Sequence, residues 1–177
     1  MGAVVRSSFR VILPLLKTQL VTAGAFGTSA ITLSLVGIPM ESLPGLVGEH
    51  DCFLMAGDER NEGDFDNASS WFDRRVRRVV QVLIRTRLQL DKVNEFSDWL
   101  TNATLGHLQL EDSIFDALDD FKVLNSSSDQ VVFESLLVTG IAAPRMVRAQ
   151  KGWGGSIINV EVGYVRSVTQ SGTAGTG

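Results

Sequence analysis

Side chains that can act as nucleophiles or metal ligands are scarce in this chain. It has two histidines, His50 and His107, and one cysteine, Cys52, among 177 residues. A zinc site or a cysteine–histidine nucleophile pair needs several such groups together. The chain also lacks a phosphate-binding glycine loop followed by Lys-Ser or Lys-Thr, and a nucleophile elbow. A calcium loop starting at Asp58 fails because its third position is Arg60, whose charge repels the ion. The sequence therefore predicts no enzyme, no cofactor and no metal site.

Charged side chains are the more informative feature, because they are segregated along the chain. Sixteen Lys and Arg against twenty Asp and Glu give a net charge of −4, which disfavours a bulk nucleic-acid coat. Six of the twelve arginines fall between residues 74 and 87, with acid-rich segments before them (49–73) and after them (111–134). Such blocks suit self-association, in which a basic patch meets an acidic patch of the next copy. Pairing of both signs within one chain is the alternative reading, and both stay open.

The arginines lie in a segment with a period of two residues. From 75 to 90 the even positions are mostly apolar and the odd positions mostly polar, which predicts one long strand with a buried and a polar face. Arg75, Arg77, Arg85 and Arg87 fall on the polar face. At about 3.3 Å per residue the strand could span about 50 Å, and we expect it to project from the domain.

The second acidic segment has helical spacing. Residues 109–122 place apolar side chains such as Ile114 on an inner face and acids on the outer face, and this predicts an amphipathic helix. The outer acids are Glu111, Asp112, Asp116, Asp119 and Asp120. A helix with this outer face could offer carboxylates to the planar, bidentate guanidinium groups of another copy.

The remaining elements complete a single α+β domain. We expect a helix at 9–20 capped by Ser7 or Ser8, a brief strand at 52–56, a charged loop at 57–70 and a helix at 91–101. Strands are predicted at 131–138 and 157–168, with a chain crossing at Pro144 and a glycine loop at 152–155 between them. This order predicts a mostly antiparallel, mixed sheet with helices on one face over residues 1–168. The Gly/Ser/Thr-rich residues 169–177 are expected to form a flexible tail.

The order of these elements resembles a known family. An N-terminal helix, a Pro/Gly-rich stretch, a long strand ending in Leu90-Asp91, a helix with Asp116-Ala117-Leu118 and a closing strand that reaches Tyr164 are similar to the tail-terminator (tail-completion) proteins of long-tailed bacteriophages. The resemblance covers roughly residues 9–168 and is one of pattern. The chain departs from the family in its length, its acidic loop at 57–70 and its glycine-rich tail, which leaves a neighbouring neck or connector role open.

The resemblance implies a structural virion protein without enzymatic activity. It implies a homo-oligomeric ring, typically a hexamer, that caps the tail tube and joins it to the neck or head connector, with DNA passing through the lumen. The protein would be made in the host cytoplasm, and no stretch reaches the roughly 18 apolar residues of a membrane-spanning helix. The expected contact joins Arg75, Arg77, Arg85 and Arg87 to carboxylates of an adjacent copy or of the tube protein. A DNA-binding module that uses the same arginines is the alternative from another class.

Overall fold

A computed structural model describes residues 8–24, 26, 31–34, 42–46, 48–62, 73–87, 106–119, 124–125, 130–131, 133–147 and 153–167. Its helices are α1 (Phe9–Thr22) and α3 (His107–Leu118). Its strands are β1 (Ile31–Ser34), β2 (His50–Glu62), β3 (Asp73–Arg87), β4 (Leu124–Asn125), β5 (Gln130–Val131), β6 (Ser135–Val147) and β7 (Trp153–Ser167). The predicted helix at 91–101 and the tail at 169–177 lie outside the described residues.

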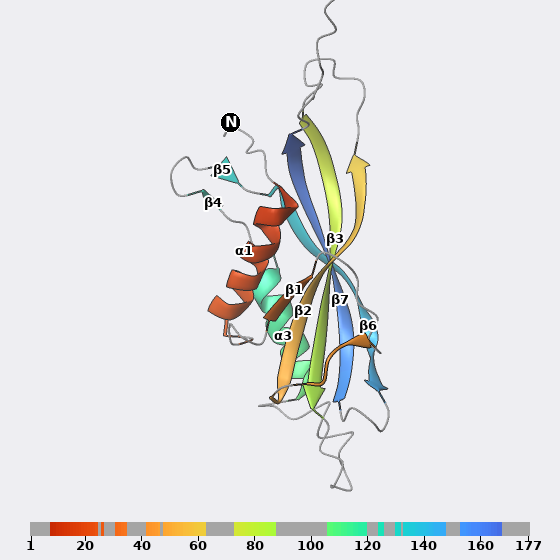
Figure 1. The fold of residues 1–177 in the computed structure, drawn as a ribbon. Helices are drawn as coiled ribbons and strands as arrows, with labels where there is room; N and C mark the ends of the chain where they lie inside the picture. The colour runs from red at the N-terminus through yellow and green to blue at the C-terminus, as the bar shows by residue number, and fades with distance from the viewer. Residues whose placement is uncertain are drawn as a thin grey trace, which may run out of the picture.

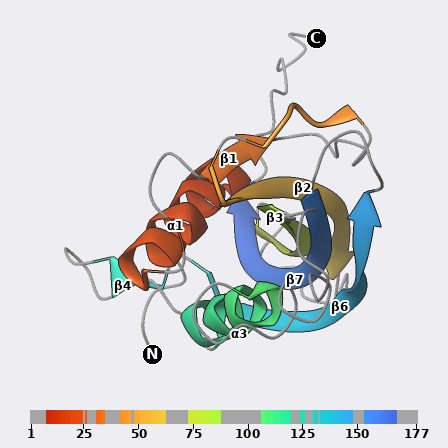
Figure 2. The same ribbon diagram turned by 90° about the horizontal axis from the view of Figure 1, so that it is seen from below.

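The strands form a five-stranded mixed sheet in the order β1-β2-β3-β7-β6, and β4 and β5 form a separate two-stranded ribbon. β1 runs parallel to β2, and every other neighbouring pair in the large sheet is antiparallel. Both helices lie on the same side of the sheet, whose long strands twist strongly along their length (Figures 1 and 2). The predicted α+β class, with helices on one face of a mostly antiparallel sheet, is confirmed.

The main core fills the space between the helices and this face of the sheet. Apolar residues of α1 recur at three- and four-residue steps, so that one stripe of the helix is buried. Even positions of β3 supply the sheet side of the core, as the alternation predicts. The fully buried members of this core on these elements and on α3 include Leu16, Leu20, Ile84, Ile114 and Leu118.

A second, smaller core lies on the opposite face of the sheet. It contains Leu43, Phe53, Met55, Leu83 and Trp153. β3 is therefore buried on both faces over residues 82–86, and the exposed arginines that the alternation predicted lie only towards its two ends, at Arg75 and Arg77 and at Arg87. The prediction of one continuous polar face is wrong, because Trp153 and Leu43, both distant in sequence, cover it around Leu83 and Arg85.

The charged segment after Ala56 is a strand where the sequence predicted a loop. β2 continues to Glu62, so the prediction of a loop from 57 is wrong over residues 57–62. The ladder shifts register between Ala56 and Glu59 and then continues with Glu59 opposite Arg78. Oppositely charged cross-strand neighbours support such a pairing. Residues 63–70 of the predicted loop lie outside the described ones.

Glycine and proline residues that were predicted to interrupt the strands lie inside them. Gly154 and Gly155 belong to β7, which begins at Trp153, so the predicted glycine loop is wrong at these positions. A Cβ atom on Gly155 would collide with the backbone oxygen of Ile84 on β3, and the glycine permits this close approach. Pro144 lies within β6, where the ladder changes register between Ala142 and Arg145. A proline fits such an irregularity on an edge strand.

Element ends differ from the prediction by a few residues. α1 begins at Phe9 after Ser8, continues through Pro14 and ends before Gly24, whose φ of 77° suits a glycine. The Ser8 side chain makes no capping hydrogen bond. α3 starts two residues earlier than predicted and ends at Leu118. β3 begins at Asp73, and residues 88–90 of the predicted strand lie outside the described ones.

Candidate functional site

Three of the four predicted interface arginines are exposed on β3. The side chains of Arg75, Arg77 and Arg87 are 68%, 47% and 45% exposed. They occupy odd positions of a strand whose even positions face the helices, so they lie on the opposite surface of the sheet. This part of the prediction agrees with the structure.

Each of these arginines has a carboxylate of the same chain nearby. Arg77 Nη1 lies 2.8 Å from Glu161 Oε1 on β7, and Arg75 Nε lies 3.6 Å from Glu134 Oε1. Arg87 Nε donates to the carbonyl oxygen of Gly48 at 2.9 Å and lies 4.0 Å from the Glu49 carboxylate. Exposed ion pairs of this kind contribute about 0–1 kcal/mol each, so their partners can be exchanged at little cost.

Arg85, the fourth predicted interface residue, is buried. Its side chain is 1% exposed, so the prediction of an exposed arginine is wrong. The guanidinium donates to both carboxylate oxygens of Asp51 and to the carbonyl oxygen of Pro44, the latter at 2.6 Å. It also lies 4.8 Å from the ring centroid of Phe53 and 5.0 Å from that of Trp153. The planar guanidinium therefore makes its hydrogen bonds and ring contacts inside its own chain and does not face a neighbouring copy.

The acids of α3 lie mostly where the sequence predicted them. Asp112, Asp116 and Asp119 are exposed at one-turn spacing, and none of them forms an ion pair with another residue that the structure describes. Asp120 lies outside the described residues. Glu111 is an exception: it was predicted on the outer face but is 6% exposed and points into the molecule.

Glu111 belongs to a buried polar cluster that sequence reasoning missed. His107 Nδ1 lies 2.8 Å from Thr86 Oγ1 on β3, and His107 Nε2 lies 2.8 Å from Ser156 Oγ on β7. The Oε1 atom of Glu111 is 3.4 Å from the same Nε2 atom. Burial raises the pKa of Glu111, but the neighbouring His107 and Ser156 side chains lower it more, and the net pKa lies below its ordinary 4.5.

This cluster has the residue types of a hydrolase triad but not the arrangement. In a triad the nucleophile and the carboxylate bind different ring nitrogens, whereas Ser156 and Glu111 share Nε2 of His107. All four residues are at most 6% exposed, so a substrate has no access to the serine. The cluster instead joins α3 to β3 and β7 and fixes the helix that presents the acids.

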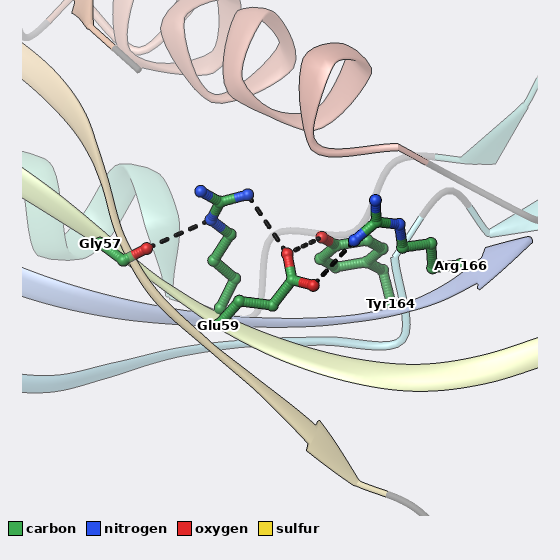
Figure 3. A network of polar contacts seen from close by, with 5 residues as sticks. Gly57, Glu59, Tyr164 and Arg166 are labelled. Atoms are coloured by element: carbon green, nitrogen blue, oxygen red, sulfur yellow. Dashed lines mark hydrogen bonds and ion pairs between the residues drawn. The ribbon is translucent and has the colours of Figure 1, made fainter. Parts of the chain in front are cut away.

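A second polar network lies where β2, β3 and β7 meet (Figure 3). The Glu59 carboxylate accepts hydrogen bonds from Arg78 at 3.2 Å, Arg166 at 2.9 Å and Tyr164 at 3.4 Å. Arg78 also donates to the carbonyl oxygen of Gly57 at 3.2 Å. Burial and the charge of Glu59 raise the pKa of Tyr164, and the two arginines partly oppose this. The network ties the twisted strands together at the register shift of β2.

The other chemistry-bearing residues are structural. Cys52 is completely buried, and burial followed by the charge of Asp51 raises the pKa of its thiol, which keeps it unreactive. His50 packs edge-on against Phe26 with ring centroids 5.4 Å apart. Within the described ranges, no three His, Cys, Asp or Glu side chains gather as metal ligands. The described helices include none that is long and apolar enough to cross a membrane.

Comparison with known proteins does not identify the chain, since no family model and no curated protein matches its sequence.

Proposed function

We propose that this protein is a structural component of a phage tail that assembles into a ring through head-to-tail contacts between identical chains. The ring would cap the tail tube and join it to the neck or connector, as in the tail-terminator proteins that the sequence resembles. Its partners would be further copies of itself, the tube protein and the neck protein, with DNA only passing through the lumen. The alternative within this class is a ring protein of the neighbouring neck or connector, which would assemble through the same contacts between copies.

One observation carries the self-assembly proposal: the basic and acidic rows lie on opposite outer surfaces of a two-layer domain. Arg75 and Arg77 face away from the helices, while Asp112 and Asp116 face away from the sheet. The two rows of one chain cannot meet each other. They can meet only between chains, and a contact between two different patches generates a ring when its rotation closes.

The exposed acids of α3 favour self-assembly over the DNA-binding alternative. Glu161, Glu134 and Glu49 lie beside the three exposed arginines and would have to give way to phosphates and to a neighbouring copy's aspartates alike, and such exposed pairs are weak. Self-assembly also uses the exposed aspartates of α3, for which DNA offers no partner because its phosphates repel them. The buried position of Ser156 and His107 supports a structural role over a hydrolytic one.

Light scattering after size-exclusion chromatography tests the proposal. We expect the wild-type chain to run as a closed oligomer and the Arg75→Glu/Arg77→Glu variant to run as a monomer, because two attractive contacts become repulsive. Arg10→Glu is the matched control, since Arg10 is exposed on α1, which belongs to neither row. A monomeric wild-type chain, or a double variant with the wild-type mass, would overturn the proposal.

A further inference from the structure

Two exposed leucines accompany the charged rows. Leu137 on β6 is 55% exposed, and Leu108 at the start of α3 is 39% exposed. β6 is an edge strand, and residues 135–142 of it carry no charged side chain. Exposed edge strands ordinarily carry charges that prevent association. An apolar edge with an exposed leucine is therefore suited to being covered by a partner.

The strand register places Leu137 on the same face of the sheet as the exposed arginines, two strands away from β3. Leu137 is opposite Glu161, which is opposite Val79, so these three define one row across the sheet. The next row on the same face contains Arg77, and the row after that contains Arg75. Successive rows are two residues apart along the strands, or about 6.6–6.8 Å.

The exposed side of α3 carries one apolar side chain followed by two acidic ones, at nearly the same spacing as the rows of the sheet. Leu108, Asp112 and Asp116 follow one another at four-residue steps on the exposed side of α3. Each step rises about 6 Å along the helix axis. One leucine followed by two aspartates thus corresponds to the row that ends at Leu137 followed by two arginine rows, with Leu137 offset sideways from the arginines by two strand spacings of about 4.8 Å each.

From this correspondence, which rests on the proposed self-assembly, we propose that α3 of one copy lies along the outer sheet face of the next copy in a defined register. Leu108 covers the Leu137 row, Asp112 reaches Arg77, and Asp116 reaches Arg75. An apolar contact beside charge-complementary pairs is the arrangement expected of a specific interface. The occupant is a second copy because both complementary surfaces belong to this chain.

The register makes Arg87 a built-in control. Arg87 lies twelve residues beyond Arg75 on β3, or about 40 Å, whereas the twelve-residue helix α3 is about 18 Å long. The helix cannot reach both ends of the strand. Arg87→Glu should therefore leave the oligomer unchanged, although Arg87 is an exposed arginine of the same strand.

A charge swap tests the register. We expect Arg77→Asp and Asp112→Arg each to weaken the apparent association constant at least tenfold, as measured by analytical ultracentrifugation. A 1:1 mixture of the two variants should reassemble, because each variant's altered group then meets an opposite charge in an alternating ring. Mixing the Arg77→Asp variant with an Asp119→Arg variant should not restore the association of the Arg77→Asp chain, because Asp119 does not lie opposite Arg77 in this register. Thermal unfolding of each variant, followed by circular dichroism, checks that the fold is retained.

The leucine contact has its own control. Leu137→Ser should weaken association at least tenfold, whereas Leu33→Ser, at a leucine that is 37% exposed on β1, should not. A wild-type chain that assembles, with Arg77→Asp and Asp112→Arg variants that do not recover on mixing, would overturn the register and leave the self-assembly intact. A wild-type chain that stays monomeric would overturn both.

Discussion

Arg85 on β3 and Asp51 on β2 are directly opposite each other in the ladder and form a bidentate ion pair. The pair lies against the second core, with the guanidinium beside the rings of Phe53 and Trp153. A charge in this place is tolerated only because its donors are used by Asp51 and by the Pro44 carbonyl oxygen. Arg85 thus fixes the 42–46 segment to the sheet.

Loss of this buried pair should be costly. We expect Arg85→Met to lower the free energy of unfolding by about 3–5 kcal/mol, because it leaves the Asp51 carboxylate without its partner. Arg87→Met, at an exposed position, should change it by about 1 kcal/mol or less. Urea unfolding of both variants checks the difference. Equal costs at the two positions would contradict the role assigned to Arg85.

Replacing both members of the pair should cost less than the sum of the single losses. Arg85→Met combined with Asp51→Leu removes both charges, so no unpaired ion remains in the core. A double-mutant cycle on urea-unfolding free energies measures this coupling. Strict additivity would mean that the two side chains act independently, against the geometry described above.

Glu111 should make stability depend on pH in the acid range. Its pKa is lower in the folded chain than the ordinary 4.5, so the folded state favours the ionised carboxylate. This stabilising contribution is complete above that ordinary value and is lost as the pH falls below it through the folded pKa. We expect Glu111→Gln to be less sensitive than wild type to acid when unfolding is measured between pH 3 and pH 6. Parallel profiles for the two proteins would refute this role of the carboxylate.

Two glycines of β7 should differ in their tolerance of a methyl group. A Cβ on Gly155 meets backbone of Ile84, which cannot move without disturbing the ladder, so Gly155→Ala should destabilise by about 1–3 kcal/mol. The atom nearest to a Cβ on Gly163 is the Ser135 hydroxyl oxygen, at 2.5 Å, and a side-chain rotation relieves that contact. Thermal melts of Gly163→Ala should therefore lie much closer to wild type. The reverse order would contradict the strand packing.

Periodicity alone predicted the parts of this fold that depend on local pattern. The alternation from 75 onward identified β3 and the exposed positions of Arg75 and Arg77, and helical spacing identified α3 and its exposed aspartates. These features follow from side-chain direction within one element. The mixed α+β arrangement followed from the order of elements, without any knowledge of their pairing.

Arg85 and Glu111 were predicted on exposed faces but are buried, because segments distant in sequence set their environment. Arg85 is buried because Trp153 and residues 42–46 cover its face of the strand, and nothing between 75 and 90 indicates this. Glu111 points inward because His107, itself held by Thr86 and Ser156, supplies a partner inside. The four-residue spacing of His107 and Glu111 was the one local signal, and many exposed helices share it.

Negative-stain electron microscopy of the purified chain tests the central claim most directly. If basic and acidic rows on opposite surfaces join copies head to tail, the images will show rings with a central hole, and the Arg75→Glu/Arg77→Glu variant will show only small single particles. Wild-type images with only monomer-sized particles, at concentrations where light scattering also gives the 19.2 kDa mass of one chain, would contradict it.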